Sequence, residues 1–189
     1  MLFESAYKTP LVSRDLRRLQ ISARICRPKE AYLVRVDWMD LELAFRDNTG
    51  TQSYLDRSTG EVLSIVEGFD DEAELREAVA ADVERHVEIT PVSLSYSKKT
   101  MRNFIKNQGA SIENKETLDA LKASLGSTVG ILTRSLDILR EDPRALALYH
   151  RFEQQCFWDH VQNFLFEQSV VPSSAPPAPE LFVEDVRLA

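Results

Sequence analysis

The chain has 189 residues, of which 43% are hydrophobic and 28% are charged, as in ordinary globular proteins, which argues against a disordered or fibrous chain. No apolar run approaches the roughly 20 residues that cross a bilayer, and the first residues lack the order of a secretory signal, so we expect no membrane association and a cytoplasmic protein. The two cysteines, Cys26 and Cys156, lie far apart without a paired motif, which favours free thiols.

The net charge of −7 is unevenly distributed along the chain. Residues 1–35 carry 8 basic and 3 acidic side chains, whereas residues 36–90 carry 4 basic and 15 acidic ones. A net negative chain is a poor non-specific ligand for nucleic acid, although a local basic face can still bind phosphates. We predict three parts: a basic N-terminal extension (1–35), a single domain (36–169) and a C-terminal segment (170–189).

A short strand and a helix are predicted around the start of the domain. The apolar run at 31–36 indicates the strand, and residues 37–45 have the apolar spacing of an amphipathic helix. Asp37 stands immediately before the first apolar residue of that pattern, where an aspartate commonly caps the helix N-terminus. We therefore expect Asp37 to be the N-cap.

Residues 53–62, SYLDRSTGEV, are predicted to form a β-hairpin. Two β-prone runs, 52–56 and 61–66, flank a short turn in which Gly60 supplies positive φ. The acids and hydroxyls also raise the question of a cation loop or a phosphate loop. Counted from Asp56, however, the spacing does not match an EF-hand, and no GxxxxGK motif is present. We therefore predict a turn, with no metal site.

A second amphipathic helix is predicted at 69–86, followed by an extended segment at 87–92. Acids crowd the first turn of this helix, where the helix dipole favours them. The apolar residues expected to face inward are Leu75, Val79 and Val83.

The second half of the domain is predicted to be helical. Apolar residues recur at helical spacing in four segments: 97–108, 114–125, 128–142 and 143–168. Pro143 suits the first position of the last helix, which is the longest and the most aromatic. The expected fold class is α+β, with a small antiparallel hairpin or sheet packed on a mainly helical C-terminal part.

The C-terminal segment combines a proline-rich stretch with a short apolar motif, ELFVEDVRL, at 180–188. Prolines with serines and alanines make a stiff, solvated linker. The motif is either a frayed terminus or a docking segment for this domain, a second copy or another protein.

The order of these motifs resembles Uncharacterised Protein Family 0158, a family of bacterial proteins with some plant relatives. The resemblance covers roughly residues 36–168 and is sharpest at Tyr-Leu-Asp-x-x-Thr-Gly-Glu-Val, residues 54–62, with supporting patterns around Trp38, Phe104 and Tyr149. It implies no activity and no catalytic residue. Members typically open the penultimate helix with a Gly-Ala-Phe-Arg-Arg-Phe-Lys-like segment, which this chain replaces at residues 126–132.

Catalytic and metal-binding patterns are weak in this sequence. Cys156 and His160 are four residues apart on one predicted helix, but zinc needs further ligands, and His150 lies about 15 Å along that helix. A buried structural thiol is therefore the preferred interpretation of Cys156. No GxSxG elbow or comparable nucleophile motif occurs. We predict no enzymatic activity and no cofactor, and the sequence identifies no small-molecule substrate.

Two surfaces remain as candidates for binding. The first is aromatic: Phe157, Trp158 and Phe166 lie off the main apolar stripe of the last helix, and the C-terminal motif offers Leu181, Phe182 and Val183. The second is a basic helix face at 97–108, which is either solvated or binds phosphates, formed by Lys98, Lys99, Arg102 and Lys106.

We therefore expect a non-catalytic regulatory or scaffolding module that binds a protein partner, or a second copy of itself, through the aromatic last helix, the C-terminal motif or both. The alternative is a nucleic-acid-associated regulator that uses the basic helix face.

Overall fold

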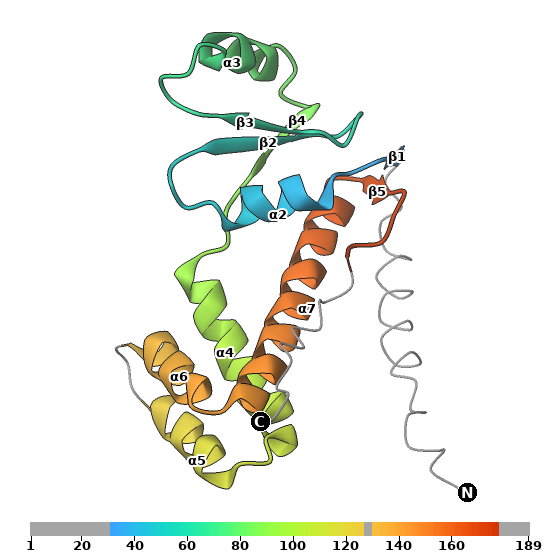
Figure 1. Cartoon of the computed structure of the whole chain (residues 1–189). Helices are drawn as coiled ribbons and strands as arrows, with labels where there is room; N and C mark the ends of the chain where they lie inside the picture. The colour runs from blue at the N-terminus through green and yellow to red at the C-terminus, as the bar shows by residue number, and fades with distance from the viewer. Residues whose placement is uncertain (1–30, 127–129, 178–189) are drawn as a thin grey trace, which may run out of the picture. The chain divides into compact units, whose positions relative to one another are not determined.

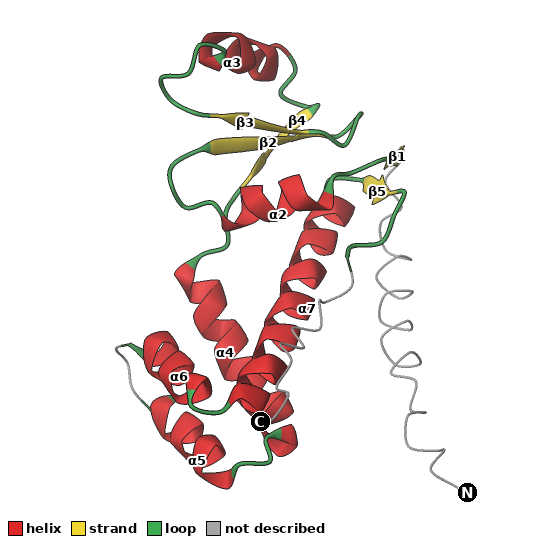
Figure 2. Ribbon diagram, in the orientation of Figure 1, coloured by secondary structure: helices red, strands yellow, loops and turns green. Residues whose placement is uncertain are grey.

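The computed structural model describes residues 31–126 and 130–177. The chain forms two compact units, 1–31 and 32–189, and every element described below belongs to the second. Helices and two small sheets make up this unit, so the predicted α+β class is confirmed (Figures 1 and 2). Among the described residues, no helix combines the length and apolar character needed to span a membrane.

A two-stranded parallel sheet joins the two ends of this unit. Strand β1 (Tyr32–Val34) pairs with β5 (Val170–Pro172), with Leu33 opposite Val171. The predicted boundaries at residues 36 and 169 therefore fall inside the folded unit, because they would separate both strands from it. Only tertiary pairing reveals this, since each strand has just three residues.

The predicted hairpin belongs to a three-stranded antiparallel sheet with strand order β3-β2-β4. Its strands are β2 (Gln52–Asp56), β3 (Val62–Ile65) and β4 (His86–Ile89). Gly60 has φ +83° in the turn, as predicted. A Cβ atom at Gly60 would lie 2.5 Å from the carbonyl oxygen of Arg35, so the turn packs directly on the chain that leaves β1.

Helices cover both faces of the antiparallel sheet (Figure 1). Helix α2 (Trp38–Arg46) covers one face and contributes to a hydrophobic core. The carboxylate of its N-cap, Asp37, accepts hydrogen bonds from two backbone N–H groups, which confirms the predicted cap. Helix α3 (Glu72–Ala81) covers the other face.

The prediction for α3 was only partly right. The helix ends at Ala81, five residues earlier than expected, and none of its residues is buried. Leu75 and Val79 are half-buried toward the sheet, but Val83 lies beyond the helix and is exposed. The helical spacing of apolar residues continues to Val83, although the chain turns toward β4 after Ala81. Periodicity alone therefore predicted a helix that is too long.

The remaining elements are helical, as predicted. They are α4 (Leu94–Gln108), the short 3₁₀ helix η1 (Gly109–Ser111), α5 (Lys115–Ser124), α6 (Ile131–Arg140) and α7 (Pro143–Glu167). Helix α4 begins three residues earlier than expected, because the hydroxyl of Ser93 accepts a hydrogen bond from the N–H of Tyr96 and caps it there. Pro143 occupies the start of α7, as predicted.

Two hydrophobic cores share α7. The first half of the helix contributes Tyr149 to a core with α4, α5 and α6, whereas the second half contributes Val161 and Leu165 to a core with α2 and the sheets. At about 100° per residue, these two buried sets lie on nearly opposite sides of the helix. Helix α7 therefore packs against both hydrophobic cores.

We expect Gly60→Ala to destabilise the protein more than Gly68→Ala. Both glycines have positive φ, which costs an alanine about 1–2 kcal/mol, but a Cβ at Gly68 meets no atom within 4 Å. At Gly60 the clash with the Arg35 backbone adds to this cost, and we expect a total loss of at least about 3 kcal/mol. Urea unfolding of both variants measures the difference. Equal losses would show that the turn can move away from β1 without penalty.

Candidate functional site: a polar pocket beside the β2–β3 turn

The carboxylate of Asp56 organises the β2–β3 turn. One oxygen accepts hydrogen bonds from the N–H and the hydroxyl of Ser58, at 2.8 and 2.7 Å, and a longer one from the N–H of Thr59. The backbone N–H of Gly60 donates to the Asp56 carbonyl oxygen at 2.8 Å. The stretch SYLDRSTGEV is therefore the predicted turn, and its acid and hydroxyls bond to each other.

Arg85 holds the other oxygen of the same carboxylate. Its Nε lies 2.9 Å from Oδ2 of Asp56, in a salt bridge whose acidic partner is only 5% exposed. Burial alone raises the pKa of Asp56, but the hydrogen bonds from Arg85 and Ser58 outweigh it and hold this pKa well below its usual value. Asp56 is consequently ionised at neutral pH and is a weak base there.

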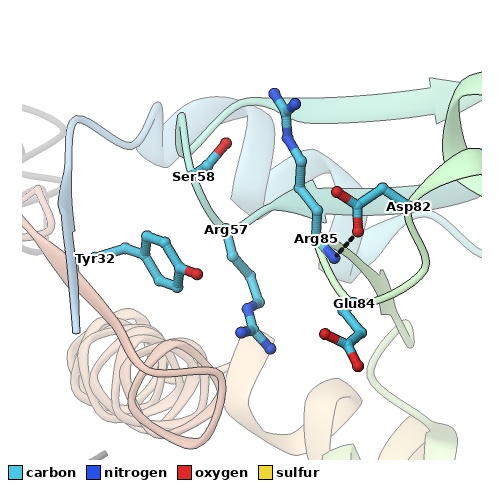
Figure 3. A pocket seen from close by; sticks show the side chains of 6 residues that line it. All are labelled: Tyr32, Arg57, Ser58, Asp82, Glu84 and Arg85. Atoms are coloured by element: carbon cyan, nitrogen blue, oxygen red, sulfur yellow. Dashed lines mark hydrogen bonds between the residues drawn. The ribbon is translucent and has the colours of Figure 1, made fainter. Parts of the chain in front are cut away.

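A pocket of about 320 Å³ lies next to this ion pair (Figure 3). It is lined from β1, from the β2–β3 turn and from the connection between α3 and β4 by Tyr32, Arg57, Ser58, Asp82, Glu84 and Arg85. Its two arginines and two acids balance in charge, so the pocket has no strong preference for an ion of either sign.

Arg57 brings to this pocket a buried nitrogen, its Nε, that has no hydrogen-bond partner among the described residues. Its guanidinium carbon lies 5.6 Å from the centre of the Tyr32 ring. Figure 3 shows the Tyr32 hydroxyl turned toward Arg57. This cation–π contact joins the β2–β3 turn to β1, as the packing of Gly60 against the Arg35 backbone also does.

The pocket does not assemble a nucleophile and a base. The Ser58 hydroxyl donates to Asp56, whose pKa is low, so this carboxylate does not draw the proton away from the serine. In the part of the chain that the structure describes, no three His, Cys, Asp or Glu residues are arranged to hold a metal ion. What the residues do together is rigidify the turn and place it against β1.

Two residues of the predicted aromatic surface are in the core. Phe157 is 0% exposed and Trp158 is 3% exposed, with their rings edge-on to Phe45 and Trp38 at 6.3 and 5.6 Å. Buried rings cannot contact a partner, so we correct the prediction and remove both from the proposed interface. Phe166 is partly exposed. The remaining predicted contacts, Leu181, Phe182 and Val183, lie outside the described residues.

The reason for this correction is the change of buried side along α7. The sequence prediction extended the stripe of Tyr149 and Phe152 through the whole helix, which left Phe157 and Trp158 apparently outside. The second core lies on the other side of the helix, so these two rings face it. The signal available in the sequence was the high apolar content around the whole helix, which is typical of a central helix.

Cys156 and His160 lie one turn apart on α7, as their spacing predicts, but they do not form a reactive pair. Burial raises the pKa of the Cys156 thiol, and the nearby acids Asp159 and Glu153 raise it further, so the thiol stays protonated at neutral pH. The His160 ring lies 5.6 Å from that of Phe45 and 5.1 Å from that of Tyr96, as a packing residue does.

The predicted basic face is present on α4. Lys99, Arg102 and Lys106 are exposed, and Lys98 is half-buried at its border. The buried residues of this helix, among them Met101 and Phe104, lie on the opposite side. Within the described residues, none of the four basic side chains is in an ion pair, so their charges are available to solvent or to a ligand.

Sequence reasoning missed Tyr32, Arg57 and Arg85 at the pocket. The missing information was strand pairing, because β2 pairs with β4 as well as with its hairpin neighbour, and this brings residue 85 next to residue 56. An aspartate at the end of one strand can form a salt bridge with an arginine just before another strand. The residues near each of them in the sequence do not identify which arginine and which aspartate will meet.

Comparison with known proteins finds one match. The model of a family described as an uncharacterised protein family (UPF0158) matches residues 30–172, a range that includes both β1 and β5. No curated protein and no solved structure matches the chain significantly.

We expect Asp56→Asn to lower the free energy of unfolding at pH 7 by about 2 kcal/mol, because the charge-assisted bonds to Arg85 are lost. The pKa of Asp56 is lower in the folded state than its unfolded value of about 3.9, so its stabilisation is present above that pH and is lost as the pH falls toward the folded pKa.

Urea unfolding at pH 7 and at pH 3 tests this expectation. The difference between wild type and Asp56→Asn should be smaller at pH 3. As a control, Asp137→Asn, which removes an exposed pair with Arg140, should change stability by less than about 0.5 kcal/mol at pH 7. If Asp56→Asn lowers the free energy of unfolding by the same amount at both pH values, the stabilising role of the Asp56 charge is contradicted.

Proposed function

Because this chain belongs to the uncharacterised protein family UPF0158, with residues 30–172 matched, we propose its function from its own surface. In this proposal the protein is a non-catalytic cytoplasmic module that binds a protein partner and acts as a regulator or a scaffold. The surface differs from the one that the sequence suggested, because the aromatic residues of α7 are largely in the core.

One observation carries this proposal: the outer face of the β1–β5 pair is apolar, and no element among the described residues covers it. Leu33 is 72% exposed, and Val171, directly opposite, is 45% exposed. Parallel strands normally have both faces covered by other elements. In this unit the inner face packs on the core through Val34 and Val170, which leaves the outer face for a partner.

A second apolar pair lies on α2, which begins four residues after β1 ends. Met39 and Leu43 lie four residues apart on the side of the helix opposite Leu41 and Phe45, and both are more than half exposed. Exposed apolar side chains that lie side by side, as Met39 and Leu43 do on α2, commonly mark interaction sites.

We expect Leu33→Asp to abolish binding of the native partner, because a buried carboxylate in such an interface would lose its hydration without compensation. Tagged full-length protein is used to recover the partner from its own cells. The matched control is Val83→Asp, since Val83 is 71% exposed but lies in the connection between α3 and β4 and not on β1 or β5.

Hydrogen exchange of the recovered complex then locates the contact. Residues of β1 and β5 should become protected. Loss of the partner in both variants, or protection confined to α4, would contradict the proposed surface.

A second candidate function is nucleic-acid binding, and the unpaired basic face of α4 favours it. Three exposed cations along one side of a helix can track a phosphate backbone. Each phosphate contact contributes a slope of about −0.9 to the dependence of binding on salt. Three or four contacts therefore give weak binding that high salt removes.

We expect Lys99→Glu with Arg102→Glu to remove any retention on DNA or RNA at low salt. The control is Lys115→Glu with Lys122→Glu, which changes the charge equally on exposed positions of α5. Fluorescence anisotropy with labelled single- and double-stranded oligonucleotides at several salt concentrations measures the affinity. Equal losses in both double variants would indicate a general charge effect, and no binding of the wild type at low salt would eliminate this candidate.

A further inference from the structure

The outward side of α2 has a defined charge pattern around its two apolar residues. Met39 and Leu43 form a ridge along the helix, 72% and 63% exposed. At about 100° per residue, Asp40 lies on one side of this ridge and Glu42 on the other. Together they give an apolar strip with an acidic group on each side.

The acidic charge along this strip is only partly neutralised. Residues 37–47 contain four acids and one base, Arg46. Arg46 is already bound to Glu42 at 2.9 Å and to Glu153 at 3.1 Å, and its guanidinium carbon lies 4.2 Å from the centre of the Phe157 ring. Asp40 is exposed and is in no ion pair among the described residues. A ligand would therefore meet net negative charge here.

We propose that this ridge binds a basic amphipathic helix of a partner protein. The apolar residues of such a helix would cover Met39 and Leu43, and its lysines or arginines would lie beside Asp40 and Glu42. The pairing follows from charge complementarity, because an acidic or neutral segment would leave Asp40 without a counter-charge, whereas a basic one supplies it. This inference rests on the proposed protein-binding function and names the chemistry of the partner.

Position on the helix makes Asp40 suitable for an electrostatic role. Its backbone N–H donates to the carboxylate of Asp37 at 3.3 Å, whereas its own carboxylate takes no part in the cap. Because Asp37 already caps α2, the Asp40 carboxylate is not needed to begin the helix. A substitution at Asp40 therefore changes the charge beside the ridge with little effect on the fold.

The test uses full-length protein and a fluorescent helical peptide of leucine and lysine, about 14 residues long and apolar on one side. The same peptide with glutamate in place of lysine is the reverse-charge probe. We expect the lysine peptide to bind the wild type and the glutamate peptide not to bind.

Two changes on α2 should weaken this binding. Asp40→Lys should lower the affinity at least about fivefold at low salt. Met39→Gln with Leu43→Gln, which keeps the charge and the helix propensity, should lower it at least about tenfold.

The matched control is Glu74→Lys. Glu74, like Asp40, is an exposed acid in the first turn of a helix, so both substitutions change the net charge and the helix-dipole interaction equally. Glu74→Lys should change the affinity by less than about twofold. If it weakens binding as much as Asp40→Lys does, the peptide follows overall charge and the inference is wrong.

Failure of this inference is distinguishable from failure of the proposed function. If the native partner is recovered through Leu33 but the lysine peptide neither binds nor competes with it, the partner is not a basic helix and only the inference fails. If the peptide binds the ridge but no recovered protein depends on Leu33, only the proposed function fails. If sedimentation shows that Met39 and Leu43 hold two copies of this chain together, the occupant is a second copy and the inference is overturned.

Discussion

The buried carboxylate of Asp56 is the interaction on which the β part of this protein depends. One of its oxygens orders the β2–β3 turn, and the other holds Arg85 at the entrance to β4, so a single side chain connects all three antiparallel strands. The ordered turn then places Gly60 against the Arg35 backbone, in a contact that no larger residue permits. Through this contact the antiparallel sheet is fixed relative to β1 and, by strand pairing, to β5.

Helix α7 determines which aromatic residues remain for binding. Because it packs one core on each side, it takes Phe157 and Trp158 into the protein and leaves Phe166 as its main exposed aromatic residue. Four of the nine large exposed apolar residues that the structure describes then lie on two small elements, the three-residue strand pair and the outward side of α2. Such elements are well suited to receive a partner, since the core supports them from behind while their outer sides have no covering element in the described part of the chain.

Acidic and basic side chains lie on different parts of the exposed surface. The region from β1 to β4 is strongly acidic, whereas the basic residues of α4 form a separate exposed face on the helical part. A partner that carries both positive charge and apolar side chains fits α2, and an anionic polymer fits α4. The two proposed functions therefore use different elements. Each can be tested by charge-reversing substitutions at exposed positions outside the two cores.

Local signals in the sequence were sufficient for the hairpin, for the positive φ of Gly60, for the N-cap at Asp37, for Pro143 as the first residue of α7, and for the helical second half. Each of these depends on residues within a few positions of one another. The same holds for the basic face of α4, which follows from helical spacing alone. What only the tertiary structure decided is which distant groups meet: Arg85 with Asp56, β5 with β1, and the second half of α7 with α2. Periodicity shows that a residue lies on one side of an element but not what that side faces, and on a helix buried on both sides it placed Phe157 and Trp158 outside when the fold puts them inside.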